Sequence, residues 1–187
     1  MADKPTSILM VGVGGQGIIM ASDIACAAAL HAGFDAKKSE IHGMSQRGGS
    51  VFSHVRFGKE IFSPVIPEGK ADILLSLELM ETLRWTAFAG PQTKFIVSWE
   101  RILPANTEEY PAGVEDGIRS LQPSAVFVDP KELVEKIGDK KYINVAFCGI
   151  LSRYVDLPEE AWKKAVDEHV PAGTFEANWA AFLTGKP

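Results

Sequence analysis

Cysteine is scarce in this sequence: Cys26 and Cys148 are the only two among 187 residues. Two thiols do not make the disulfide framework of a small secreted protein. They also fall short of the four thiolates that an iron–sulfur cluster usually takes, so this chain cannot hold such a cluster alone. Each cysteine lies among small apolar residues, which favours a role as a small core side chain.

Long apolar runs are absent as well. No stretch reaches the about 18 uninterrupted apolar residues that indicate a membrane span. The N-terminal run at residues 7–13 is short, ends in glycines and is followed by nothing that resembles a cleavage site, so it does not predict a signal peptide. We therefore expect a protein of the reducing cytoplasm that has no membrane partner.

The sequence has no excess of positive charge. It carries 24 acidic residues against 19 lysines and arginines, for a net charge of -5. Such a balance argues against a general nucleic-acid binder, so any phosphate site must be local. The chain is 46% hydrophobic and 23% charged, which is typical of a soluble globular protein, and its length predicts one domain over residues 1–187.

Strand and helix patterns alternate along the chain. They predict an α/β fold: a three-layer sandwich around a mostly parallel, mixed sheet, with a Rossmann-like strand–glycine loop–helix opening and a helical C-terminal segment. Strands are expected at 7–13, 34–41, 50–58, 71–79, 94–98 and 124–129, and residues 59–64 as the return of a hairpin. Helices are expected at 16–32, 80–88, 113–121, 131–137 and 143–154, from 158 onward, and at 174–183.

A glycine-rich turn, GVGGQG, follows the first strand and opens the first helix. Glycines let the backbone approach a ligand closely, and the N–H groups at a helix N-terminus attract phosphate. A dinucleotide site would also need an acid about 20 residues further on, and Glu40 lies in that range. Three interpretations remain open: close helix packing only, a phosphate-bearing ligand, or a dinucleotide. The candidate binding residues of this turn are Gly12, Gly14, Gly15, Gln16 and Gly17.

A second polar segment, SEIHGMSQRGGS at 39–50, gathers an acid, an imidazole, hydroxyls, an amide and a guanidinium. An arginine beside two glycines suits an anion, because backbone N–H groups can join its side chain. Loops that follow strand ends gather at one edge of such a sheet, so this segment is expected to face the glycine turn. The alternative is a solvated turn. The candidate binding residues here are Glu40, Ser45, Gln46 and Arg47, and the sequence predicts neither a catalytic residue nor a metal site.

These motifs carry a resemblance to a known family. GVGGQG, then SEIHGMSQRGGSVFSHVRFG, then SPVIPEGKADILLSLE resemble the gamma-type domain of 2-oxoacid:ferredoxin oxidoreductases. The resemblance is strongest to the small (beta) subunits of the indolepyruvate ferredoxin oxidoreductases. It runs in order across residues 8–86 and continues more weakly to residue 185. Three long motifs in order are far more specific than a glycine turn alone.

The resemblance implies an enzyme subunit that works with partners. These enzymes decarboxylate a 2-oxoacid such as an aryl-pyruvate, pass electrons to ferredoxin and release an acyl-CoA. Thiamine diphosphate, magnesium and the iron–sulfur clusters would lie on a large (alpha) subunit, and this chain would be inactive alone. Gamma-type domains are thought to help bind coenzyme A, which would place its phosphates on Gly14 to Gly17, with Arg47 as a second contact.

Two alternatives stay open beside the indolepyruvate assignment. One is the gamma subunit of a pyruvate or 2-oxoglutarate ferredoxin oxidoreductase, and the other is a stand-alone dinucleotide-binding protein. Four apolar residues of the expected hairpin, Phe52, Phe57, Ile61 and Phe62, are either core residues or part of an interface with the large subunit. If that surface is left exposed, the isolated chain is expected to self-associate.

Overall fold

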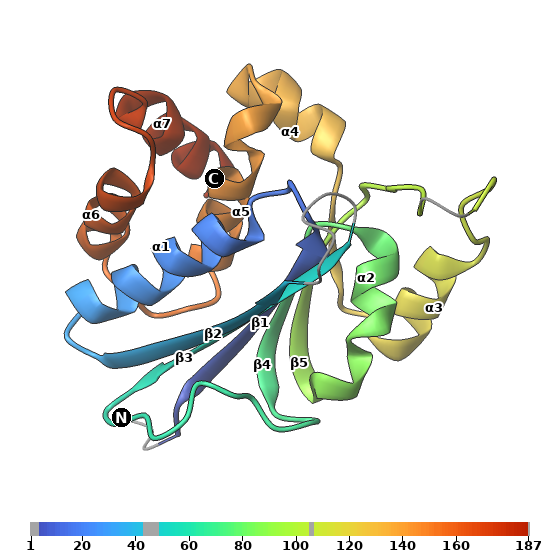
Figure 1. The fold of residues 1–187 in the computed structure, drawn as a ribbon, viewed down its shortest axis with the longest axis horizontal. Coiled ribbons are helices and arrows are strands. Elements are labelled where there is room, and N and C mark those ends of the chain that lie inside the picture. The colour runs from blue at the N-terminus through green and yellow to red at the C-terminus, as the bar shows by residue number, and fades with distance from the viewer. Residues whose placement is uncertain (1–3, 43–48, 105–106, 187) are drawn as a thin grey trace.

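The computed structural model describes residues 4–42, 49–104 and 107–186. They form one six-stranded sheet in the order β2-β3-β1-β4-β5-β6 (Figure 1). Only β3 runs against the other strands, because its pairings with β1 and with β2 are antiparallel while the remaining pairings are parallel. The strands are β1 (Thr6–Val13), β2 (Asp35–His42), β3 (Ser50–Gly58), β4 (Ala71–Ser76), β5 (Ala89–Ser98) and β6 (Val126–Val128).

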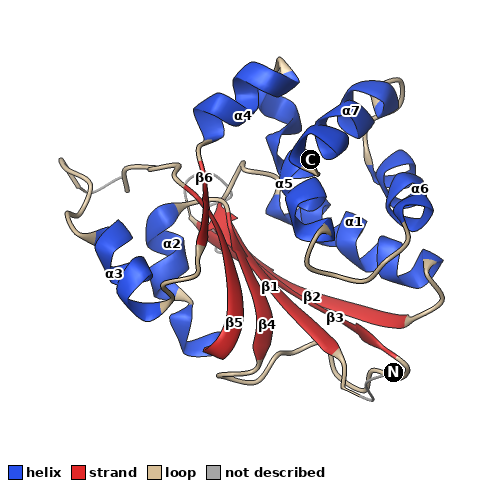
Figure 2. Cartoon of the chain, turned by 180° about the vertical axis from the view of Figure 1, so that it is seen from behind, coloured by secondary structure: helices blue, strands red, loops and turns tan. Residues whose placement is uncertain are grey.

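Helices cover both faces of this sheet (Figure 2), which makes the three-layer α/β arrangement expected from the sequence. Helices α1, α5, α6 and α7 lie on one face, with α4 packed beside them, and α2 and α3 lie on the other. The helices are α1 (Ile18–His31), α2 (Leu79–Arg84), α3 (Val114–Leu121), α4 (Pro130–Ile137), α5 (Ile143–Ser152), α6 (Glu159–His169) and α7 (Phe175–Gly185), with 3-10 turns η1 (Thr86–Phe88) and η2 (Lys140–Tyr142). None of the helices in the described ranges has the length and apolarity to cross a membrane.

The central strand β1 separates two apolar clusters because its side chains alternate between the two faces. Ile8 and Met10 join the larger cluster beneath α1 and α5, whereas Leu9 and Val11 join the smaller one beneath α2 and α3. All four are buried. A strand that is buried on both faces in this way is typical of a sheet covered by helices on each side.

The expected hairpin return at 59–64 is wrong. Both edges of β3 are already occupied, by β1 on one side and β2 on the other, so no edge is left for residues 59–64 to pair with. The segment instead follows an irregular path held by β2. The backbone N–H of Ile61 donates to the Asp35 carboxylate at 2.7 Å, and the Lys37 ammonium donates to the Ile61 carbonyl.

The four apolar residues considered for an interface do not form one exposed surface. Phe57 and Ile61 are core residues, with 4% and 2% of their surface exposed. Phe52 is half-buried and packs against Trp85, with ring centroids 3.9 Å apart and the ring planes tilted by 42°. Phe62 alone is open to solvent, at 87% exposed. The core interpretation is therefore correct for Phe57 and Ile61.

Candidate functional site

The glycine turn between β1 and α1 has the left-handed backbone that glycine favours. Gly15 has a φ of 99° and Gly17 a φ of 78°. At Gly17 a Cβ atom would also lie 2.5 Å from the side-chain nitrogen of Asn144, so a larger residue there would require the Asn144 side chain to shift. At Gly15 a Cβ would meet nothing within 4 Å, so the backbone there is open to an approaching group.

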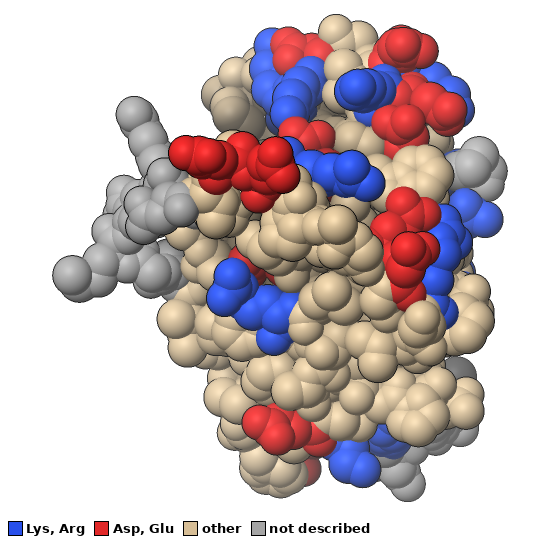
Figure 3. Space-filling model, turned by 90° about the vertical axis from the view of Figure 1, so that its right-hand side faces the viewer, with Lys and Arg blue, Asp and Glu red and all other residues tan. Residues whose placement is uncertain are grey.

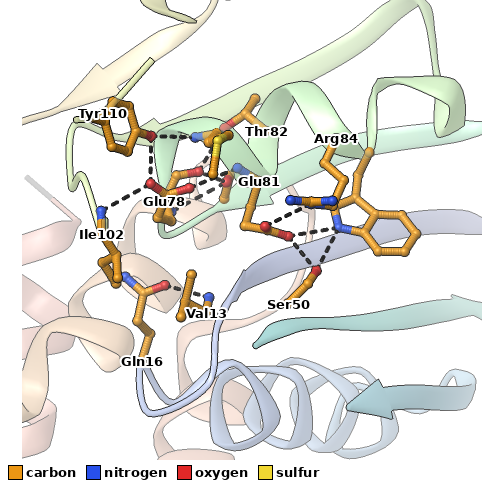
Figure 4. Close-up of polar contacts among 12 residues, drawn as sticks. Val13, Gln16, Ser50, Glu78, Glu81, Thr82, Arg84, Ile102 and Tyr110 are labelled. Atoms are coloured by element: carbon orange, nitrogen blue, oxygen red, sulfur yellow. Dashed lines mark hydrogen bonds and ion pairs between the residues drawn. The ribbon is translucent and has the colours of Figure 1, made fainter. Parts of the chain in front are cut away.

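Gln16 holds this turn against the neighbouring strand (Figure 4). Its Oε1 accepts a hydrogen bond from the Val13 N–H at 2.8 Å, and its Nε2 donates to the Leu77 carbonyl at 2.7 Å. A Cβ on Gly12 would lie 2.8 Å from the same Oε1 atom, so glycine at that position makes room for the Gln16 side chain. Both polar atoms of Gln16 are thus engaged by the protein backbone, and the residue shapes the turn.

A cavity of about 560 Å³ opens beside the turn. It lies at the carboxyl ends of β1, β4 and β5, which is where open α/β sheets bind their ligands. Gly14, Gly15, Gln16 and Gly17 all line it. Further along the chain it is lined by Leu77, Ser98, Glu100, Ile102, Lys140, Lys141, Ile143, Asn144 and Phe147.

Two helices begin at this cavity. Helix α1 starts after Gly17, helix α5 starts at Ile143, and residues at both starts line the cavity. Neither helix, both fully described, has a side-chain cap or an acidic residue in its first turn. Asn144 connects them by donating from Nδ2 to the Gly17 carbonyl at 3.3 Å. Helix α5 continues directly from η2, where the Asp139 carboxylate accepts from the Lys141 N–H and the Ile143 N–H donates to the Lys140 carbonyl. The uncapped N–H groups at the positive end of α1 are therefore the ones that favour an anion here.

Two lysines add positive charge to the same cavity. Lys140 pairs with Glu100 at 2.8 Å and Lys141 with Asp139 at 2.9 Å, and both lysine side chains are mostly exposed. The hydrogen bond to Asp139 raises the pKa of Lys141. The sequence interpretation missed both residues. The available signal was the pair of lysines at 140 and 141, separated by one residue from the predicted helix at 143–154.

The C-terminal end of the second polar segment contacts the glycine turn. The Gly14 N–H donates to the Gly49 carbonyl at 2.8 Å, which confirms that this end of the segment faces the turn. The predicted contacts Ser45, Gln46 and Arg47 lie outside the described residues. Ser50, the last residue of the segment, donates a hydrogen bond from its hydroxyl to the Glu81 carboxylate. The same carboxylate also accepts from Trp85 Nε1 at 3.1 Å (Figure 4).

Glu78 is a second buried carboxylate in this region, with 1% of its surface exposed. It accepts hydrogen bonds from the Tyr110 hydroxyl at 2.6 Å, the Ile102 N–H at 3.2 Å and the Glu81 N–H at 2.8 Å (Figure 4). Burial and the bond to Glu78 raise the pKa of Tyr110 above its usual range, so its hydroxyl stays a donor. These contacts fasten the segment that carries Ile102 to the start of α2.

The structure does not bring Glu40 to the cavity. It lies on β2, which β3 separates from β1, whereas a dinucleotide fingerprint needs the acid on the strand beside β1. Its carboxylate pairs with Lys38 at 2.7 Å, and Lys38 also contacts Asp23 of α1. Glu40 therefore takes part in an ion-pair group between β2 and α1.

Among the described residues, neither the two cysteines nor the charged side chains indicate a metal site or a second anion-binding site. Burial raises the pKa of Cys26, and it raises the pKa of Cys148 to about 12, so both thiols resist conversion to the thiolate that binds metals. No group of three or more His, Cys, Asp or Glu in the described ranges has the geometry of a metal site. On the face shown in Figure 3, acidic and basic side chains are intermingled, with no separate patch of one sign.

Comparison with known proteins gives consistent matches over almost the whole chain. The family described as pyruvate ferredoxin/flavodoxin oxidoreductase matches residues 7–186. The indolepyruvate oxidoreductase subunit IorB of Archaeoglobus fulgidus is 37% identical over 187 residues, which cover 96% of this chain and 92% of that protein.

Solved structures share the fold. The gamma subunit of a keto/oxoacid ferredoxin oxidoreductase from Geobacter sulfurreducens superposes with a TM-score of 0.72 at 24% identity, covering 97% of this chain and 96% of that chain. The 2-oxoglutarate:ferredoxin oxidoreductase from Magnetococcus marinus, solved with 2-oxoglutarate, coenzyme A and succinyl-CoA bound, has a TM-score of 0.75 at 18% identity. It matches 99% of this chain and 31% of the longer chain.

Proposed function

Because this chain belongs to the pyruvate ferredoxin/flavodoxin oxidoreductase family, we propose that it is the small subunit of an indolepyruvate ferredoxin oxidoreductase and contributes to its coenzyme A site. That it is a small subunit of a 2-oxoacid:ferredoxin oxidoreductase follows from its relatives. The choice of indolepyruvate is supported by the name of the relative that is 37% identical to it.

The overall reaction would divide between subunits. A 2-oxoacid loses carbon dioxide, its electrons pass to ferredoxin, and the acyl group is transferred to coenzyme A. Thiamine diphosphate with magnesium and the iron–sulfur clusters are assigned to the large partner subunit, as the sequence resemblance implies. The residues of this chain do not fit a cluster, since its two cysteines are too few and have raised thiol pKa values.

One arrangement supports the coenzyme A role most strongly. The open glycine turn, the uncapped N-terminus of α1 and two lysines all border a single cavity. Coenzyme A carries a diphosphate and a further phosphate, which backbone N–H groups and ammonium groups bind well. Its binding to the structural relative from Magnetococcus marinus is consistent with this proposal.

Calorimetric titration of coenzyme A into the complex of the two subunits tests the role of this chain. The double variant Lys140→Gln/Lys141→Gln should weaken binding by about 10-fold, because it removes two charge-assisted contacts that are partly screened by solvent. The double variant Lys163→Gln/Lys164→Gln, at two exposed positions of α6, removes the same charge as the matched control and should leave binding unchanged. Equal affinities in all three proteins would reject the coenzyme A role of this cavity.

The substrate needs its own measurement. Reduction of ferredoxin by the two-subunit enzyme should be faster with indolepyruvate or phenylpyruvate than with pyruvate or 2-oxoglutarate. A preference for 2-oxoglutarate would favour the alternative suggested by a relative, the 2-oxoglutarate synthase subunit KorC of Methanothermobacter thermautotrophicus, which is 25% identical to this chain. That outcome would change the substrate and leave the subunit assignment in place.

A further inference from the structure

Glu100 places a negative charge in a cavity whose other features favour anions. It is the one acidic side chain among the described residues that line the cavity. Its Oε1 accepts a hydrogen bond from Lys140 at 2.8 Å, and no bond to its Oε2 is formed by any residue in the described ranges. The side chain remains 23% exposed, so part of the carboxylate faces solvent beside the glycine turn.

The backbone around Glu100 is held firmly. Its carbonyl accepts from the Leu79 N–H at 3.0 Å, and its own N–H donates to the Ser98 hydroxyl at 3.2 Å. Two residues later, the Ile102 N–H donates to buried Glu78 at 3.2 Å. Groups fixed by such surrounding bonds are suited to recognition, because little ordering is needed when a ligand arrives.

A carboxylate beside a phosphate site lowers affinity for a bare phosphate, since like charges repel. It raises affinity only for a ligand that brings a hydrogen-bond donor, because a carboxylate is an acceptor. In dinucleotide-binding folds an acid at a strand end accepts from a ribose hydroxyl, and the sequence offered Glu40 for that role. Here β3 displaces Glu40 from the site, and Glu100 after β5 is the acid at the cavity.

We propose that Glu100 accepts a hydrogen bond from a hydroxyl or amine donor on a nucleotide-type ligand, and so selects such a ligand over a simple phosphate. This inference rests on the proposed function, since it assumes that the cavity binds the phosphates of coenzyme A. Glu78 accepts from the Ile102 N–H at 3.2 Å, two residues from Glu100, and so helps to hold the wall of the cavity.

The test compares two probes on the complex of both subunits. Coenzyme A carries hydroxyl and amine donors, whereas pyrophosphate at neutral pH offers essentially charge alone. For Glu100→Ala, calorimetry should show coenzyme A bound about 10-fold more weakly and pyrophosphate bound about 3-fold more tightly. Glu135→Ala, an exposed acid of α4, is the matched control and should change neither affinity.

Glu100→Gln keeps an acceptor oxygen and loses the charge. It should therefore hold coenzyme A at least as tightly as the unmodified protein does, and it should bind pyrophosphate about 3-fold more tightly. If Glu100 acts only through its charge, Glu100→Ala should bind both probes more tightly. If Glu100 has only a structural role, Glu100→Ala should bind both probes more weakly. Either result overturns the proposal for Glu100. If the unmodified complex binds neither coenzyme A nor pyrophosphate, the proposed function itself is overturned.

Discussion

The backbone N–H of Gly14 donates a 2.8 Å hydrogen bond to the carbonyl oxygen of Gly49. This bond joins the end of the second polar segment to the glycine turn, although the two motifs are far apart in the sequence. The contact is possible because β3, which begins at Ser50, runs antiparallel to β1 and starts where β1 ends. The two segments singled out by the sequence thus meet at one edge of the sheet.

Arg47 stays a prediction from the sequence, since it lies outside the described residues. If it contacts a phosphate of coenzyme A, Arg47→Ala removes a charge-assisted bond worth about 1.5–3 kcal/mol. The dissociation constant for coenzyme A in the two-subunit enzyme should then rise by roughly 10- to 100-fold. Arg153→Ala, an exposed arginine after α5, provides the control. An unchanged coenzyme A dependence would reject the role of Arg47.

Gly17 and Gly173 separate backbone strain from steric clash. Both have a φ of 78°, but only at Gly17 would a Cβ meet the Asn144 side chain, at 2.5 Å. Gly173→Ala should lower the free energy of unfolding by about 1–2 kcal/mol through strain alone. Gly17→Ala should lower the free energy of unfolding by about 1 kcal/mol more, because of the added clash with Asn144. Urea unfolding of the two variants measures the difference, and equal losses would show that Asn144 moves aside freely.

Helices α5 and α7 cross so closely that glycine is required. A Cβ on Gly149 would lie 2.0 Å from the Phe182 carbonyl oxygen. Gly149→Ala should therefore lower the free energy of unfolding by at least about 3 kcal/mol. In α3, a Cβ on Gly117 would have its nearest contact at 3.4 Å, so Gly117→Ala should stabilise by up to about 1 kcal/mol through helix propensity. Thermal unfolding of both variants checks the contrast, and a stable Gly149→Ala protein would contradict the close crossing.

His54 should make stability depend on pH. It is 4% exposed, its Nδ1 accepts from the Ile66 N–H at 3.3 Å, and burial lowers its pKa below 6.5. The unfolded chain therefore takes up a proton more readily than the folded one. The stabilisation from neutral His54 is complete above pH 6.5 and is lost as the pH falls through the lower pKa of the folded state.

This pH dependence can be measured by urea unfolding across that range. His54→Phe cannot titrate, so its free energy of unfolding should lack the part of the slope that His54 contributes, even though the Ile66 N–H loses its acceptor. A slope equal to that of the unmodified protein would assign the pH dependence to other groups.

The subunit assignment predicts a division of activity. The purified chain should contain no stoichiometric iron, and neither subunit should reduce ferredoxin by itself, whereas the mixture should form a stable complex and do so. The physical reason is that two poorly ionised thiols cannot hold a cluster. Full coenzyme A-dependent turnover by the large subunit alone would refute the partnership. Hydrogen exchange on the complex can map the surface that the large subunit covers, and protection within residues 42–62 is expected.

Much of the fold was predictable from local patterns. The glycine turn after the first apolar run predicted the β1–α1 unit, and the alternation that follows predicted the order of the later elements. These features are local, because strand and helix periodicity and turn glycines act within a few residues. The prediction of a hairpin at 59–64 was wrong because it depends on distant contacts. Whether β3 has a free edge is determined by strands far away in the sequence.

The composition of the site was decided by tertiary structure. From the sequence alone, the family, the glycine turn and the shortage of cysteine could be established, since each rests on residue types and their spacing. Which acid reaches the cavity depends on the order of the strands, and the insertion of β3 between β2 and β1 removes Glu40 and leaves Glu100. Lys140 in η2 and Asn144 in α5 come from far along the chain, because helix packing on the sheet, rather than sequence distance, determines which side chains meet.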